Sequence, residues 1–198
     1  MDLEDPVEVA LTMSEVLAGA GIEHALYGAL LLAAYGEARE TRDADLAVVN
    51  VDVHPVLAGL RKAGIEAQVE FENLELGGLQ ASRISLFGTP TDPGMNNLDL
   101  LAPMSARFAR RAQTRSVRSQ LRGRRISVLT PEDYLLFKVL SSRARDLSDG
   151  ASVLNHLGAE MDRSYIETEV ALLSSEILAH PVKQRWAEMS DLRREDGA

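Results

Sequence analysis

The sequence predicts an α/β fold in which a mixed sheet is flanked by helices and followed by a helical C-terminal part. Short apolar runs bounded by glycines alternate with stretches of helical periodicity up to about residue 128. Beyond that point the pattern of apolar residues is helical throughout. We therefore expect an α/β core over residues 1–128 and a helical part over residues 129–198, and the two can share one hydrophobic core.

Apolar spacing and glycine stops define the elements of the first part of the core. The expected elements are a helix over 7–18, a strand over 22–27, a helix over 29–35, a strand over 44–51 and a helix over 55–63. Gly36 and Gly64 follow the second and third of these helices, where a residue without Cβ commonly ends a helix.

Strands dominate the middle of the chain. Alternating or buried patterns predict strands over 65–71, 79–87 and 98–101. Gly77-Gly78 is expected to form a turn, and the breaker-rich stretch 88–94 (GTPTDPG) a loop. A helix should follow Pro103, and a hairpin should turn within residues 121–124.

The C-terminal part begins with a clear helix-start signal. Thr130 is a natural N-cap, Pro131 suits the first turn, and Glu132 and Asp133 suit the positive end of the helix dipole. Helix breaks are expected near Gly150, Gly158 and Pro181.

Composition and charge exclude several classes of protein. A net charge of −9 argues against a surface built wholly to grip nucleic acid. The chain has no cysteine, which excludes disulfides, zinc–thiolate sites and thiol nucleophiles. Residues 1–5 lack the features of a secretory signal, and the longest apolar stretch, 25–35, is too short to cross a bilayer. We therefore expect a cytoplasmic protein without membrane partners.

The arginine stretch, residues 107–125, contains eight arginines and no acidic residue. Such a run can pair with carboxylates elsewhere in an acidic chain, or it can face phosphates of RNA or of a triphosphate. The sequence leaves these interpretations open.

Carboxylates stand at the entrances of two predicted buried strands. Asp43 and Asp45 flank Ala44, so their side chains point to the same face of a strand. They repel each other unless a cation lies between them, and Mg²⁺ is the cation that carboxylates and phosphates usually share. Asp99 opens the strand over 98–101, and it would join them if the two strands are neighbours. The alternative is that Asp43 is a turn residue paired on the surface with Arg39 or Arg42.

The surrounding sequence resembles the nucleotidyltransferase fold superfamily, the polymerase-β-like group. Its signature is a strand, a glycine turn, a short helix and Asp-x-Asp, which matches Tyr27-Gly28-Ala29 followed by residues 39–46 (RETRDADL). This form looks most like the bacterial branch that contains abortive-infection toxin nucleotidyltransferases. Residues 129–138 (LTPEDYLLFK) and 143–149 (RARDLSD) resemble the later motifs of that branch.

The resemblance implies transfer of a nucleotidyl group from an NTP to a hydroxyl or phosphate, on RNA or on a small molecule. Asp43 and Asp45 would bind Mg²⁺, and Asp99 would bind a second ion and orient or deprotonate the acceptor. The residues implied to contact the nucleotide are Gly28, Ala29, Arg39, Thr41 and Lys138. A toxin of this branch would also have an antitoxin protein as its partner.

Alternatives stand beside this interpretation. Position 29 is Ala where the family usually has Gly or Ser, which favours a non-catalytic relative that senses NTP or binds a partner. Lys138 could instead be a solvent-facing helix residue. Arg145 and Asp149, spaced i, i+4, would form a surface ion pair.

Overall fold

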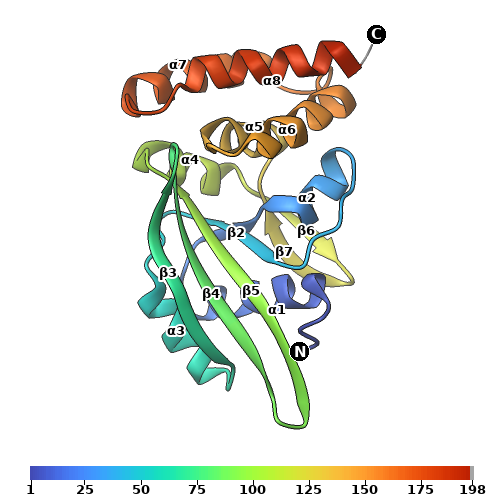
Figure 1. Ribbon diagram of the computed structural model, residues 1–198, viewed down its shortest axis with the longest axis vertical. Helices are drawn as coiled ribbons and strands as arrows, with labels where there is room; N and C mark the ends of the chain where they lie inside the picture. The colour runs from blue at the N-terminus through green and yellow to red at the C-terminus, as the bar shows by residue number, and fades with distance from the viewer. Residues whose placement is uncertain (197–198) are drawn as a thin grey trace.

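The computed structural model describes residues 1–196 and confirms the α/β fold class (Figure 1). The strands are β1 (His24–Leu26), β2 (Ala44–Val48), β3 (Glu66–Leu76), β4 (Leu79–Thr89), β5 (Asp92–Pro103), β6 (Val117–Leu121) and β7 (Arg124–Val128). The helices are α1 (Pro6–Gly19), α2 (Gly28–Tyr35), α3 (Val53–Lys62), α4 (Ala106–Arg115), α5 (Pro131–Leu140), α6 (Ala144–Leu157), α7 (Arg163–Glu176) and α8 (Val182–Asp196). The C-terminal helices gather at one end of the molecule (Figure 1).

All strands belong to one mixed sheet with the order β3-β4-β5-β2-β1-β7-β6. β2 runs parallel to β5 and antiparallel to β1, and β1 runs parallel to β7. The long hairpin of β4 and β5 reaches well beyond the end of β2 (Figure 1). This order makes the two carboxylate-bearing strands, β2 and β5, direct neighbours.

The helix-start signal at Thr130 is confirmed. The Thr130 hydroxyl accepts a hydrogen bond from the backbone N–H of Asp133, and Pro131 is the first residue of α5. Asp5 caps α1 in the same way, accepting from the N–H groups of Val7 and Glu8.

The loop expected over 88–94 is wrong. β4 continues to Thr89 and β5 already begins at Asp92, with these two residues paired in register, so only a tight turn separates the strands. Pro93 is tolerated because it lies in the irregularity between the pairs Phe87–Met95 and Thr89–Asp92 and has no register partner on β4. β2 pairs with β5 only from Leu98 onward, so a missing N–H at Pro93 costs no ladder bond on that side either.

The helix break expected near Gly150 is also wrong, since Gly150 lies inside α6 and is buried. A Cβ at this position would lie 2.4 Å from the terminal carbon of Met189 in α8. Glycine therefore serves close packing of two helices here, and the helix continues through it.

One hydrophobic cluster runs through both parts of the chain. It includes Leu46 and Leu100 of the sheet together with Phe137 and Met189 of the C-terminal helices. The ring of Tyr27, at the entrance of α2, lies 5.2 Å from that of Phe137 in α5. The boundary at residues 128 and 129 stays a prediction. Beyond it, α7 and α8 pack on α5 and α6, and Phe137 of α5 contacts the rings of Tyr27 and Phe108. No helix within residues 1–196 combines the length and the apolar character needed to cross a bilayer.

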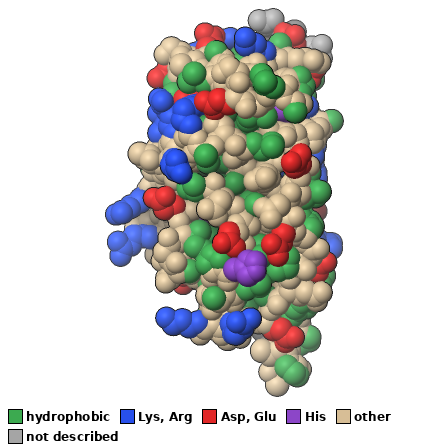
Figure 2. Space-filling model, turned by 90° about the vertical axis from the view of Figure 1, so that its left-hand side faces the viewer, with side chains coloured by type: hydrophobic (Ala, Val, Ile, Leu, Met, Phe, Trp, Pro, Cys, Tyr) green, Lys and Arg blue, Asp and Glu red, His purple; other side chains and the backbone are tan. Residues whose placement is uncertain are grey.

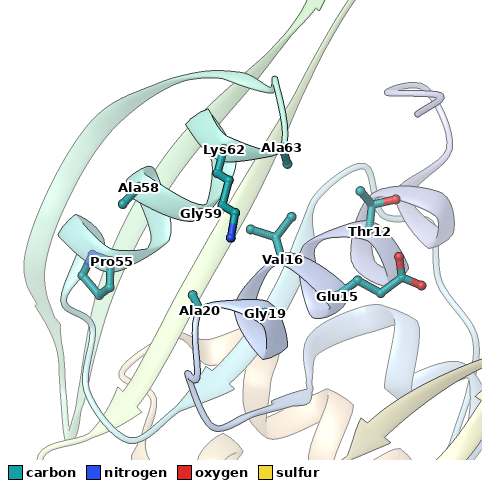
Figure 3. A pocket seen from close by; sticks show the side chains of 10 residues that line it. All are labelled: Thr12, Glu15, Val16, Gly19, Ala20, Pro55, Ala58, Gly59, Lys62 and Ala63. Atoms are coloured by element: carbon teal, nitrogen blue, oxygen red, sulfur yellow. The ribbon is translucent and has the colours of Figure 1, made fainter.

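A shallow hollow of about 670 Å³ lies between α1 and α3 (Figure 3). Small side chains line most of it, including Ala20, Ala58 and Ala63. A Cβ built on Gly59 of α3 would lie 3.0 Å from the Val16 side chain of α1, so the two helices pack closely there. None of the carboxylates at the strand entrances lines this hollow.

Candidate functional site

The structure brings the three carboxylates together at adjacent strands. Asp45 of β2 is opposite Asp99 of β5 in the parallel register, and Asp43 lies immediately before β2. Residues directly opposite one another project to the same face of a sheet. Asp43, two residues before Asp45, follows the same face. The neighbouring strands expected from the sequence therefore create a cluster of three acidic groups.

A single arginine holds two of these carboxylates. Arg83 of β4 is opposite Asp99 in the antiparallel register. Its Nε donates to Asp99 Oδ1 and its Nη2 to Asp99 Oδ2, both at 2.7 Å, and Nη2 also donates to Asp43 Oδ2 at 3.1 Å. Asn97 Nδ2 donates to the other oxygen of Asp43 at 3.2 Å. Asp43 thus pairs with Arg83, and the alternative of a surface pair with Arg39 or Arg42 is wrong.

Asp45 differs from its two neighbours. Within the part of the chain that the structure describes, its carboxylate forms no hydrogen bond or ion pair. Burial and the nearby charge of Asp99 raise the pKa of Asp45 to about 7. Lys138 and Arg143 offset part of this rise through their charges, but no described cation contacts the Asp45 carboxylate directly.

The glycine turn lies directly against Asp45. Gly28 has a φ of +68°, in the left-handed region, and a Cβ built on it would lie 1.9 Å from Asp45 Oδ2. Only glycine permits this conformation and this approach without displacing the carboxylate. Gly28 also opens α2, whose N-cap Tyr27 provides no side-chain hydrogen bond, so the first amides of the helix lack a capping side chain.

The other residues expected to contact the nucleotide lie at different depths. Thr41 donates to the backbone oxygen of Asp43 at 3.3 Å, which braces the loop before β2. Ala29 is buried in the first turn of α2. Arg39 lies in the same loop as Thr41 and pairs with Asp149 of α6 at 3.3 Å.

Lys138 needs a correction, because it is only 1% exposed. Its ammonium lies 2.6 Å from Asp146 and 2.8 Å from Asp149, over the rings of Tyr27 and Tyr134. Neither a solvent-facing position nor direct contact with a bound triphosphate fits this arrangement. Lys138 is instead a buried counter-ion between α5 and α6.

Asp149 is likewise not part of the expected surface pair with Arg145. Its side chain is 6% exposed and bonds Lys138 and Arg39. For the neighbouring Asp146, burial would raise the pKa, but the charges of Lys138 and Arg143 outweigh burial and lower it to about 2. The later motif therefore forms a buried ionic network that ties α5 and α6 to the loop before β2.

Comparison with known proteins identifies solved structures that share this architecture. No protein-family model and no curated protein sequence matches the chain. Solved structures do resemble it. The aminoglycoside nucleotidyltransferase ANT(2″)-Ia, in complex with adenylyl-2″-tobramycin, matches with a TM-score of 0.51 at 12% identity, over 86% of this chain and 97% of that chain. The chain has a nucleotidyltransferase-like fold.

Two further structures are similar to the chain to a lesser degree. An antigenic nucleotidyltransferase-like protein from Paracoccidioides brasiliensis gives a TM-score of 0.49 at 17% identity, over 90% of this chain and 93% of that one. A solution structure of the antibiotic-resistance factor ANT(2″)-Ia gives 0.45 at 15% identity, over 91% and 100%.

The sequence resemblance led us to expect Mg²⁺ at these carboxylates, and the chemistry of the donors is compatible with that expectation. The donors are carboxylate oxygens, which Mg²⁺ prefers, and the Asp45 carboxylate has no direct partner among the described side chains. As the side chains stand, no three His, Cys, Asp or Glu residues within the described chain are arranged around a metal position. Arg83 engages both oxygens of Asp99 and one of Asp43, which accounts for this arrangement.

The arginine stretch pairs mainly with acidic residues of the same chain. The pairs are Arg107 with Glu169 and Glu176, Arg111 with Glu169, Arg115 with Glu132 and Asp133, Arg122 with Asp5, and Arg124 with Glu8 and Glu15. On the side of the molecule where β3 and α3 lie, basic and acidic side chains are interspersed (Figure 2). Most of the stretch therefore acts within the fold.

Arg115 illustrates this internal role, and we expect Arg115→Gln to destabilise the protein. Its guanidinium bonds the fully buried Asp133 at 3.0 Å and stacks 3.9 Å above the ring of Tyr165. Loss of a hydrogen bond to a charged group costs about 1.5–3 kcal/mol. Urea unfolding should show this loss, whereas Arg118→Gln, on the exposed β6, should be nearly neutral. Equal stability of the two variants would contradict the internal role.

Sequence reasoning missed Arg83 and Asn97. Arg83 is the one charged residue in the stretch Leu79–Leu86, whose other residues are all uncharged. A lone arginine in a buried strand indicates an acidic partner nearby. The hairpin register that selects Asp99 as this partner is not visible in the sequence.

The raised pKa of Asp45 predicts a pH-dependent penalty on stability. Its folded pKa of about 7 exceeds the unfolded value, so the folded protein holds this proton more tightly. Stability due to this group is therefore complete below about pH 4 and is lost as pH rises toward 7. In metal-free buffer, the melting temperature of Asp45→Asn should rise relative to that of the parent as the pH increases from 5 to 8. A pH-independent difference would contradict the shift, and Glu66→Gln, an exposed acid, serves as control.

Proposed function

We propose that the protein is a Mg²⁺-dependent nucleotidyltransferase that moves a nucleoside monophosphate from an NTP to a hydroxyl or phosphate acceptor. The observation that carries the proposal is the unpaired carboxylate of Asp45, set against the Gly28 turn and beside Asp43 and Asp99. A carboxylate with neither an ion-pair partner nor a hydrogen bond is costly in a structural role, and it is useful where a cation and a phosphate will bind.

Each residue of the site has a part in this transfer. The Gly28 turn lets the triphosphate approach the uncapped amides of α2, where the helix dipole favours negative charge. Asp43 and Asp45 would hold Mg²⁺, which when bound neutralises charge on the phosphates and aligns them for attack. Asp99 orients the acceptor and accepts its proton as the acceptor oxygen bonds to the α-phosphorus. The bond from that phosphorus to the bridging oxygen breaks, and pyrophosphate leaves.

The acceptor in this proposal is RNA or a small molecule. For RNA, the available contacts from the arginine stretch are Arg110, Arg118 and Arg125, which form no ion pair with the side chains that the structure describes. For a small molecule, the net charge of −9 favours a cationic acceptor, and the similar ANT(2″)-Ia is seen with adenylyl-2″-tobramycin. Similarity to the abortive-infection branch adds a toxin role, with an antitoxin protein as partner.

A non-catalytic relative is the second candidate. Two observations favour it, namely Ala29 at the glycine turn and the engagement of both Asp99 oxygens by Arg83. Such a protein would bind NTP or a partner through the same fold without turnover.

A transfer assay separates these candidates. The protein is incubated with each labelled NTP and Mg²⁺, with total RNA, with a panel of aminoglycosides, or with neither, and label is scored on the acceptor. Transfer to one acceptor class that Asp45→Asn lacks and Glu66→Gln retains would support the enzyme. NTP binding without transfer to RNA, aminoglycoside or the protein itself would favour the non-catalytic candidate.

A further inference from the structure

The carboxylate cluster contains a cation supplied by the protein itself. Arg83 reaches across from β4 and makes three hydrogen bonds, two to Asp99 and one to Asp43. A guanidinium keeps its charge at any pH the protein will meet, so this cation can leave the cluster only by moving. Its side chain is 31% exposed, which leaves it a path toward solvent.

The hydrogen bonds of Arg83 and Asn97 reach the carboxylate oxygens of Asp43 and Asp99 but not those of Asp45. Arg83 and Asn97 together take both oxygens of Asp43, and Arg83 alone takes both oxygens of Asp99. Of the three carboxylates, Asp45 alone has no hydrogen-bond partner among the described side chains. A divalent cation shared by Asp43 and Asp45 would therefore lie beside the guanidinium that binds Asp43 Oδ2, and the two positive charges would repel each other.

We propose that Arg83 is a built-in counter-ion that competes with the divalent cation for Asp43 while it holds Asp99 in position. The inference rests on the proposed metal site. In the metal-free protein the arginine neutralises the cluster and lowers its apparent affinity for divalent cations, because the competent arrangement is only part of the population. A nucleotide that arrives with its own metal adds its binding energy to the displacement of Arg83. Divalent cations are therefore expected to bind weakly without nucleotide and more tightly together with it.

Metal binding without nucleotide tests the competition directly. Mn²⁺ affinity of the full chain is measured by calorimetry, with electron paramagnetic resonance of free Mn²⁺ as an independent reading. Arg83→Gln should bind Mn²⁺ at least about tenfold more tightly than the parent, because a unit charge near the metal has been removed. Arg83→Lys keeps a charge without the forked contact and should fall between them.

Arg124→Gln is the matched control. Arg124 is 30% exposed and also holds two carboxylates, those of Glu8 and Glu15, away from the cluster. Its removal should leave Mn²⁺ affinity within about twofold of the parent. Without metal, Arg83→Gln should melt below the parent, and saturating Mn²⁺ should raise its melting temperature more than that of the parent.

Mn²⁺ affinity unchanged or weaker in both Arg83 variants overturns the inference, and Arg83 is then a brace between β4 and β5. Should Arg83→Gln fail to fold, the Arg83→Lys titration decides alone, since tighter binding supports the competition and parental affinity rejects it. The transfer assay reports separately on the proposed function. Tighter Mn²⁺ binding in a protein without transferase activity keeps this inference and rejects the enzyme.

Discussion

Replacing both Asp43 and Asp45 with Asn is expected to abolish nucleotidyl transfer, with a loss well beyond 100-fold. Residues that merely support metal ligands cost about 10–100-fold when changed, so removing two proposed ligands should cost more. The fold should persist in the double variant. The Asp45 carboxylate forms no hydrogen bond with the described side chains that Asn would lose, and Asn at position 43 keeps an oxygen for Arg83 or Asn97.

The measurement is transfer rate and Mg²⁺–NTP affinity on the same preparation, with the melting temperature as the check on folding. Glu66→Gln, on the exposed end of β3, is the matched removal of negative charge. Unchanged NTP affinity in a folded double variant would contradict the metal site at Asp43 and Asp45.

Lys138→Met is expected to destabilise the protein by about 3–5 kcal/mol, the range found when one partner of a buried ion pair is removed. The ammonium is the shared partner of Asp146 and Asp149, and its loss leaves both carboxylates buried with less compensation. For a chain of this size the loss corresponds to about 6–20 °C in melting temperature. Thermal melts and urea unfolding both report it.

Lys183→Met, on the exposed surface of α8, should change the melting temperature little. A normal melting temperature in Lys138→Met, together with lost NTP affinity, would contradict the counter-ion role and return Lys138 to the nucleotide site. The double variant Lys138→Met with Asp149→Asn should recover part of the stability, since it removes one of the stranded charges.

The sequence alone determined much of the framework of this protein. Glycine stops and apolar spacing located the helices and strands, and the cap at Thr130 placed the start of α5, because these signals act within a few residues along the chain. The alternation of a strand placed Asp43 and Asp45 on one face, and the motif order pointed to the nucleotidyltransferase-like fold. The breaker residues at 88–94 wrongly predicted a loop, because β4 and β5 extend into this stretch and leave only a tight hairpin turn.

The tertiary structure alone decided the partners of the charged side chains. Arg83 meets Asp99 because the turn after Thr89 fixes the register of β4 on β5, and it meets Asp43 because β2 lies on the far side of β5. Lys138 is buried because α6 packs over α5 and brings two carboxylates onto it. A charge costs several kcal/mol when it is buried alone and little when it is paired, so its role depends on what the fold places beside it. For Lys138 and Arg83 these neighbours lie between 8 and 40 residues away along the chain, and no local pattern identifies them.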